Sequence, residues 1–120
     1  MQEKIDEYGQ DLFIQAQATN GIGEAEKTAL ANLTRLTRDG FLELMIKNKL
    51  DTLVTPGNRV STILAVGGFP GIIVPAGFDS QGTPFGICFG GVKGSEPNLI
   101  EIAYGFEQAT KIRKPPKIEV

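Results

Sequence analysis

VSTILAVGGFPGIIVPAGFDSQGTPFGICFGGVKGSE, the stretch from Val60 to Glu96, decides the fold and carries most of the 15 glycines in the chain. Glycine adopts backbone angles that other residues avoid, and it lets main chains approach closely. A glycine-rich run that encloses apolar segments therefore predicts tightly packed strands joined by demanding turns.

Two apolar segments inside this stretch are predicted to be strands. Residues 71–76 are continuously apolar, which is typical of a strand covered on both faces, and residues 85–90 form the second segment. Pro75 lacks an N–H group, so it should lie at a strand end or on a sheet edge. Residues 77–84 have the composition of a surface loop. The expected product is an antiparallel hairpin with an extended loop.

A helix is predicted on each side of this hairpin. Ser61 is the predicted cap of a short apolar helix that ends at Gly67-Gly68. Ser95 is the predicted cap of the closing helix, with Pro97 in the first turn, where a missing N–H matters least. The closing helix should bury a stripe of four residues: Leu99, Ile102, Ala103 and Phe106.

The first half of the chain has helical periodicity. An amphipathic helix is predicted over residues 3–19, weakened by Gly9 and stopped by residues 20–23. A second helical pattern runs from Glu24 toward Asn48, and Gly40 either divides it or lies inside one helix. The apolar face predicted for this second pattern consists of Leu30, Leu33, Phe41, Leu44 and Met45.

A change of period follows these helices. Residues 50–57 form a short β-favouring run closed by Pro56-Gly57, which predicts a buried strand that enters a turn. Helices followed by such a strand indicate an α/β fold.

Length and composition place the chain among ordinary globular domains. It has 120 residues, 41% of them hydrophobic and 22% charged, which argues against disorder and against a coiled coil. The net charge of −2 includes no basic block, so we expect no nucleic-acid partner. No apolar run approaches the roughly 20 residues that span a bilayer, and the opening MQEKIDEYGQ does not resemble a signal peptide. The sequence as given is expected to be soluble and intracellular, in an undetermined compartment.

Cysteine and histidine content limits the chemistry. Cys88 is the single cysteine, so no disulfide can form within the chain, and its apolar neighbours predict a buried, inert thiol. The chain has no histidine, which removes Ser-His and Cys-His nucleophile pairs and His-ligated metal sites. We expect no cofactor and no metal.

Templates for catalytic and phosphate-binding loops also fail. Lys93-Gly94-Ser95 does not fit the Walker pattern, and Gly-x-Gly-x-x-Gly is absent. Ser61, Ser80 and Ser95 are predicted at helix starts and in a turn, and none lies in a Gly-x-Ser-x-Gly motif. No catalytic residue is predicted in this chain.

Four motifs, taken in order, carry a family resemblance. These motifs are LDTLVTP at residues 50–56, GGFPGIIVPAG at 67–77, PFGI at 84–87 and SEPNL at 95–99, the last followed by YGFEQAT at 104–110. Together they resemble the C-terminal end of amidase signature enzymes, most closely plant-type amidases. The resemblance covers essentially the whole chain, which we identify as a C-terminal fragment of such a hydrolase. It implies the C-terminal part of an α/β/α sandwich with a mixed sheet, in which residues 1–120 form one partial domain.

The resemblance also implies an activity and a site. Amidase signature enzymes hydrolyse amide bonds with a Ser-Ser-Lys triad, whose Gly/Ser-rich segment and lysine context match nothing in this chain. The chain should therefore be inactive alone and contribute core and one wall of a substrate pocket. In the family the short helix before the Phe-Pro-Gly turn helps to line that pocket, which implies four substrate-binding positions: Thr62, Ala65, Val66 and Phe69.

Two other hypotheses stay open. A truncated sheet exposes strand edges and an apolar face, so the chain can be a non-catalytic association module that complements the missing N-terminal portion or another partner chain. It can also be an independent small-ligand module, which requires a pocket enclosed by this chain. A small amide substrate is expected only in the complete enzyme.

Overall fold

The computed structural model describes residues 4–115, which fall into two compact units, one before Asn32 and one from Asn32 onward. The first unit contains α1 (Ile5–Tyr8) and α2 (Asp11–Gln17). The prediction of one helix over residues 3–19 is wrong, because Gly9 takes a positive φ of 66° and an extended ψ that end α1 there. The predicted stop at residues 20–23 is confirmed.

Three helical segments continue the chain without a break: α3 (Glu24–Thr37), the π-helical turn η1 (Arg38–Leu42) and α4 (Glu43–Lys47). Gly40 therefore lies inside the helical run, at a turn that holds one residue more than an α-helix. That extra residue rotates the helical face by about 100°. Phe41 and Met45 are buried as predicted, whereas the prediction is wrong for Leu30, Leu33 and Leu44, which are exposed.

The sheet has three strands, β1 (Leu53–Pro56), β2 (Gly71–Phe78) and β3 (Pro84–Gly90), in the order β1-β3-β2 with both pairings antiparallel. The predicted hairpin is therefore confirmed. Its first strand ends two residues later than predicted, at Phe78, and its second strand begins one residue earlier, at Pro84. Pro75 lies on an edge strand, as expected, beside a register shift between Pro75 and Gly77.

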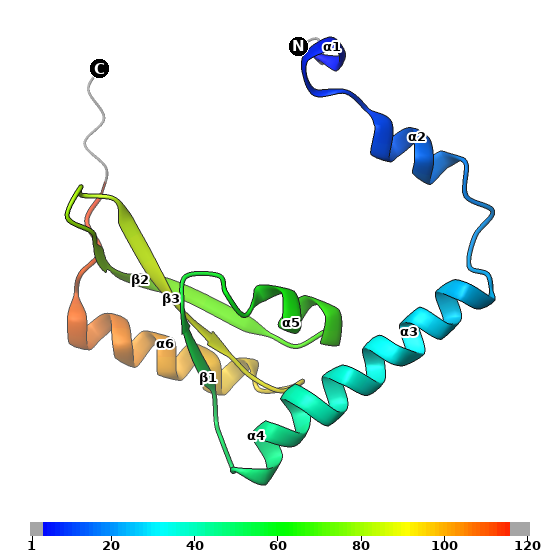
Figure 1. Ribbon diagram of the computed structural model, residues 1–120. Helices are drawn as coiled ribbons and strands as arrows, with labels where there is room; N and C mark the ends of the chain where they lie inside the picture. The colour runs from blue at the N-terminus through cyan, green and yellow to red at the C-terminus, as the bar shows by residue number, and fades with distance from the viewer. Residues whose placement is uncertain (1–3, 116–120) are drawn as a thin grey trace. The chain divides into compact units, whose positions relative to one another are not determined.

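Helices cover the sheet only in part. α5 (Ser61–Gly67) and α6 (Glu96–Thr110) are both present as predicted, and Figure 1 shows α6 lying along the β2–β3 hairpin. The burial of β1 and β2 alternates along each strand. The prediction that β2 is covered on both faces is therefore wrong for the described chain, because α6 covers one face of β2 and leaves Ile73 exposed on the other. The prediction that β1 is buried is wrong at Val54, which is exposed.

The helix caps differ in detail from the prediction. Val60 occupies the cap position of α5, so Ser61 is its first helical residue, and no side-chain cap is formed. Ser95 does occupy the cap position of α6, but its side chain makes no capping hydrogen bond. Its hydroxyl oxygen is buried beside Gly91, and this packing keeps it away from the free N–H groups of the helix. Gly68 ends α5 in the left-handed conformation, as expected.

Two apolar clusters hold the second unit together. The first joins Phe41, Met45, Val60 and Leu64 to Cys88 of β3. The second packs the α6 stripe of Leu99 and Ala103 against Phe89, with Ile102 and Phe106 partly buried beside them, which confirms the predicted stripe. Leu64 lies so close to the sheet that a β-carbon at Gly90 would approach its side chain to 3.0 Å. Glycine at this position is what allows α5 to pack against β3.

Candidate functional site

The helix α5 orients three of the four predicted substrate-binding residues. At 100° per residue, Thr62, Ala65 and Val66 share one face of α5, opposite the buried Leu64. All three are exposed in the described chain. The pattern that buries Leu64 in the first cluster therefore leaves these three side chains pointing away from the core.

Phe69 lies in a different environment. Its backbone N–H donates to the Leu64 carbonyl at 2.8 Å, which closes the end of α5 and turns the chain toward β2. Its ring packs against Phe41, with 4.8 Å between the ring centroids. In the described chain Phe69 thus lies against the π-helical turn, whereas Thr62, Ala65 and Val66 lie on the exposed face of α5.

Phe69 lines a cavity of about 400 Å³, here called the Phe69 cavity. Leu42 and Val92 are its other large apolar residues, and Gly67 adds backbone. Thr37, Arg38 and Lys93 supply polar groups to the lining. This volume is in the range of small-molecule pockets, and the mixture of an apolar lining with a few polar groups is typical of them.

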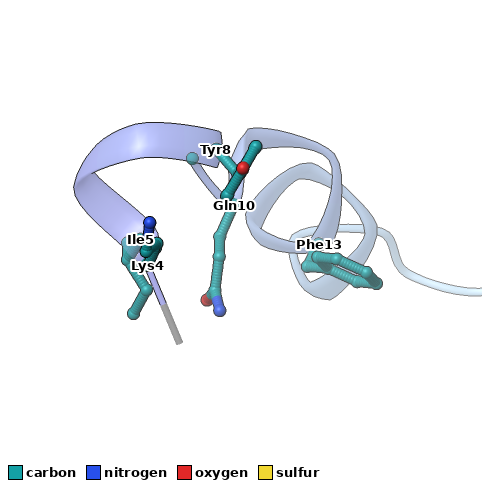
Figure 2. A pocket seen from close by; sticks show the side chains of 6 residues that line it. Lys4, Ile5, Tyr8, Gln10 and Phe13 are labelled. Atoms are coloured by element: carbon teal, nitrogen blue, oxygen red, sulfur yellow. The ribbon is translucent and has the colours of Figure 1, made fainter. Parts of the chain in front are cut away.

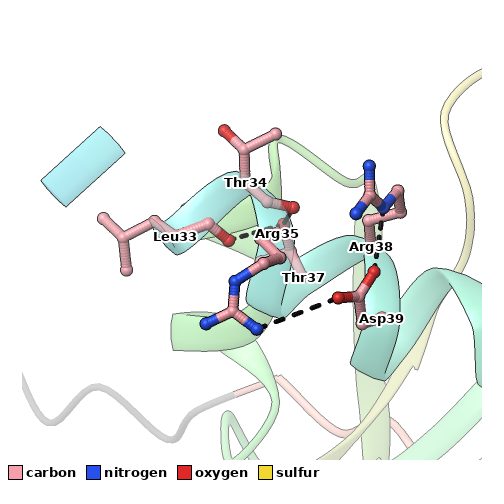
Figure 3. Close-up of polar contacts among 6 residues, drawn as sticks. All are labelled: Leu33, Thr34, Arg35, Thr37, Arg38 and Asp39. Carbon is pink, nitrogen blue, oxygen red and sulfur yellow. Dashed lines mark hydrogen bonds and ion pairs between the residues drawn. The ribbon is translucent and has the colours of Figure 1, made fainter. Parts of the chain in front are cut away.

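Two residues that supply polar groups to the Phe69 cavity, Thr37 and Arg38, come from the junction of α3 and η1. Figure 3 shows the Thr37 hydroxyl turned back to donate to the Leu33 carbonyl at 3.0 Å, and Arg38 Nε donating to Asp39 Oδ1 at 2.9 Å. The hydrogen bond from Arg38 to Asp39 and the charge of that carboxylate raise the pKa of Arg38. The Arg38 guanidinium is positively charged across the physiological range, as arginine side chains in proteins are.

Lys93 was not among the predicted site residues. It follows β3 and extends to the end of α5, where its ammonium nitrogen lies 3.5 Å from the position that a Gly68 β-carbon would take. A cation at a helix C-terminus interacts favourably with the helix dipole. In the sequence, Lys93 is marked only by its place in the turn after a predicted strand. That position does not show whether the side chain contacts a ligand or the end of a helix.

Cys88 and the serines occupy ordinary structural positions. The Cys88 thiol is buried in the first cluster, and desolvation raises its pKa, as expected for an inert core cysteine. Ser61 lies in the first turn of α5, Ser80 in the hairpin loop and Ser95 beside Gly91. The described residues contain no group of three or more Cys, Asp or Glu side chains placed to hold a metal ion.

A second cavity lies in the first unit and has a different character. Figure 2 shows Lys4, Ile5, Tyr8, Gln10 and Phe13 around a hollow of about 260 Å³ between α1 and α2. Tyr8 and Phe13 are themselves largely exposed to solvent. The hollow is therefore a shallow surface between two short helices.

Known proteins were compared with the chain in sequence. No family model matches it. A probable amidase of Arabidopsis thaliana is 60% identical over 116 residues, which make up 97% of this chain and 23% of that protein. A glutamyl-tRNA(Gln) amidotransferase subunit from a Nostoc strain is 47% identical over 54 residues, or 11% of its length. The chain thus spans less than a quarter of the Arabidopsis relative.

Solved structures give the same relationship for the fold. An amidase family protein from Bacillus anthracis matches 93% of the chain with a TM-score of 0.84 and 33% identity, and the match takes up 22% of that protein. The peptide amidase of Stenotrophomonas maltophilia matches 93% of the chain with a TM-score of 0.84 and 35% identity, over 26% of its own chain. None of the described helices is long and apolar enough to cross a membrane. The sequence identity and the structural matches show that the chain corresponds to the C-terminal part of amidase-family proteins.

Proposed function

We propose that the chain supplies part of the core and one wall of the substrate pocket of an amide hydrolase, while the reacting groups lie on the rest of the enzyme. The single observation that carries this proposal is the relationship to amidases over about a quarter of their length. The sequence contexts of Ser61, Ser80 and Ser95 support it, because none of them lies in a Gly-x-Ser-x-Gly motif.

The wall is assigned to the outer face of α5. Thr62, Ala65 and Val66 offer a hydroxyl and two apolar groups on one exposed face, which suits contact with an uncharged amide substrate. Phe69 ends the helix and supports that wall through its contact with Phe41. In this proposal the chain positions the substrate, and the Ser-Ser-Lys triad of the rest of the enzyme carries out nucleophilic attack on the amide carbonyl.

Hydrolysis of a simple p-nitroanilide tests the proposal. The purified chain should release no p-nitroaniline above the buffer rate. Mixing it with the part of the Arabidopsis amidase that it does not match should restore turnover. Val66→Asp should then raise KM, because a carboxylate on the wall opposes an uncharged substrate, whereas Ile63→Asp, on another flank of α5, should not. Turnover by the chain alone that is lost on replacing Ser61, Ser80 or Ser95 with alanine would overturn the proposal.

A second candidate function is a purely non-catalytic association module. The exposed apolar side chains of α3 and α4, among them Leu33, Leu36 and Ile46, favour it because large apolar surfaces mark interaction sites. The two functions differ in one measurement. A module that only associates would bind the remaining part of the amidase, but Val66→Asp would leave KM unchanged.

A further inference from the structure

The connection between α2 and α3 contains the only asparagine of the chain that is followed by glycine, Asn20-Gly21. Asparagine is a thermolabile residue. Its side-chain amide carbon is electrophilic, and the backbone nitrogen of the next residue can attack it and close a succinimide ring. The reaction requires a conformation in which these two atoms come close, so the local structure decides which asparagines react.

The backbone around this pair lies outside the helices on both sides. Thr19 closes the end of α2, because its hydroxyl and its backbone N–H both donate to the Ala16 carbonyl, at 2.8 and 3.2 Å. The start of α3 is fixed at Gly23, whose N–H donates to Glu26 Oε2 at 2.8 Å in the manner of a capping box. Between them, the N–H groups of residues 20–22 have no hydrogen-bond acceptor within the described chain. Helical hydrogen bonds therefore do not restrain the backbone at this pair.

Gly21 leaves the approach to the Asn20 side chain open. Both residues are exposed. Gly21 has a φ of +86°, and apart from its chain neighbours no heavy atom lies within 4 Å of the position that a β-carbon would take. Glycine rotates about its backbone bonds more freely than other residues, and no side chain shields its nitrogen. The Gly21 nitrogen can therefore reach the Asn20 amide carbon without displacing packed groups.

Asp39-Gly40 provides a contrast within the same chain, because aspartate cyclises by the same attack. This pair lies inside η1, where helical hydrogen bonds hold the backbone. Figure 3 shows the carboxylate held as well: Oδ1 accepts from Arg38 Nε at 2.9 Å, and Oδ2 lies 4.0 Å from Arg35 Nη1. A charged carboxylate is a poor electrophile, and closing the ring would require the helix to open locally. The structure thus protects Asp39 and leaves Asn20 free to react.

The other asparagines are followed by larger residues. The side-chain amide of Asn48 donates to a carbonyl of α4 at 2.9 Å, and Asn32 and Asn98 lie inside α3 and α6. Asn58 lies in the turn after β1 and precedes an arginine. A side chain on the following residue hinders the approach of its nitrogen, and a helix holds that nitrogen away from the amide carbon. Asn20 is therefore singled out by both its neighbour and its backbone.

We propose that Asn20 is a site of spontaneous deamidation. The Gly21 nitrogen bonds to Asn20 Cγ, the C–N bond of the side-chain amide breaks, and its nitrogen leaves as ammonia with the proton that the Gly21 amide loses. Water then adds to one of the two succinimide carbonyl carbons and breaks the bond from that carbon to the Gly21 nitrogen, which takes a proton from the water. Opening at Cγ gives aspartate, and opening at the backbone carbonyl gives isoaspartate, in which the main chain runs through Cγ.

The product adds one negative charge close to the start of α3. α3 already begins with Glu24 and Glu26, and the positive end of a helix dipole favours such charges. Ile22, the next residue toward the helix, is exposed, so the new carboxylate meets no packed side chain there. Conversion should therefore change the charge of the chain and leave the stability of the unit from Asn32 onward unchanged. This inference goes beyond the proposed function and does not depend on it.

Peptide mapping by mass spectrometry tests the site on the purified full chain. During incubation at pH 8, a form in which oxygen replaces NH should accumulate at Asn20, and more slowly at pH 6, because the attacking nitrogen must lose its proton. Gly21→Ala should slow this conversion at least about tenfold, because the added methyl group hinders the close approach of the two atoms. Asn20→Gln keeps an amide on a longer side chain and should abolish it at this position.

A comparison of buffer and urea separates the effect of local structure from that of sequence. The Asn20 rate should change by no more than about twofold in urea, because this loop needs no opening. Asp39 should isomerise detectably only in urea, where η1 is lost. Hydroxylamine cleaves succinimides and should split the wild-type chain between Asn20 and Gly21. Urea midpoints of both variants and of the deamidated chain should equal that of the fresh wild type.

Each result supports or overturns the assignment. Conversion at Asn20 that Gly21→Ala slows at least about tenfold supports it. An unmodified Asn20 after Asn58 has reacted, or Asp39 reacting ahead of Asn20 in buffer, would overturn it. An Asn20 rate that rises more than about tenfold in urea would also overturn it, because the native loop would then be restrained. Amide hydrolysis enters none of these measurements, so they succeed or fail independently of the proposed function.

Discussion

Leu64 has the most demanding position in the core, because it fills the space between α5 and two glycines of the sheet. β-Carbons at Gly71 and Gly90 would approach its side chain to 2.6 and 3.0 Å. Leu64→Ala should therefore reduce the free energy of unfolding by about 2–5 kcal/mol, the usual cost of a large cavity. The control is Ile63→Ala on the same helix, where a side chain that is 47% exposed should cost less than half as much. Urea unfolding measures both, and equal losses would contradict the packing described.

Cys88 gives a single chemical probe of that core. Burial raises the pKa of its thiol above the ordinary value of 9.0, so the neutral thiol is favoured in the folded chain. Labelling by a disulfide reagent at pH 8 should be slow in buffer and fast in urea, because the thiolate is the reactive form. The stability that the thiol contributes is present below its unfolded pKa and is lost as pH rises through the folded pKa. Equal labelling rates in buffer and urea would contradict its burial.

At the scale of elements, two glycines in helical segments should respond in opposite ways to alanine. Gly68 takes a φ of +63° at the end of α5, where a β-carbon is strained, so Gly68→Ala should destabilise the chain by about 1 kcal/mol. Gly105 lies inside α6 with open space where its β-carbon would be, so Gly105→Ala should stabilise it by about 0.5–1 kcal/mol. Thermal unfolding of the pair checks both signs, and a stabilising Gly68→Ala would contradict the left-handed cap.

The β2–β3 loop depends on one carboxylate. Asp79 Oδ1 accepts hydrogen bonds from the backbone N–H groups of Thr83 and Gln81, both at 2.8 Å. The bond from Thr83, followed in size by the opposing desolvation and the bond from Gln81, lowers the pKa of Asp79. A lowered pKa stabilises the folded state above the unfolded value of 3.8 and loses this contribution as pH falls through the folded pKa.

A pH series of urea midpoints tests this role. The difference between the wild type and Asp79→Asn should be present at pH 7 and shrink as the pH falls below 3.8. Ser80→Ala in the same loop serves as the control and should show no such dependence. A difference that stays constant down to pH 2 would assign the effect of Asp79→Asn to packing in place of charge.

At the scale of the whole molecule, many large apolar side chains of the described chain are exposed. Exposed large side chains occur on α2, α3, α4 and α6, with Phe13, Leu36, Ile46 and Tyr104 as examples. A hydrophobic dye should therefore fluoresce with the chain alone and lose that signal when the rest of the amidase is added. A chain that stays monomeric and binds no dye would contradict both the association and the proposed function.

Sequence patterns predicted what is local in this molecule. Turn chemistry located the hairpin, the Gly68 cap and the edge proline, because each depends on a few neighbouring residues. The continuous apolarity of residues 71–76 predicted two covered faces, yet Ile73 is exposed, because the described chain has helices over only part of the sheet. The π-helical turn was missed because one inserted residue has no signature of its own. Phe69 and Lys93 are far apart in the sequence, and they line the same cavity only because the chain folds.

The strand order has a consequence for how the chain folds. β3 lies between two strands that precede it in the sequence, so Leu53 cannot pair before Gly90 is in place. The β2–β3 hairpin closes over a short loop and can form within microseconds, whereas β1 joins only after a long loop closes. On the ribosome the sheet cannot assemble until β3 has left the exit tunnel. β1 and the helices before it are therefore synthesised before the strand with which β1 pairs, and the hairpin is the natural nucleus for folding of this sheet.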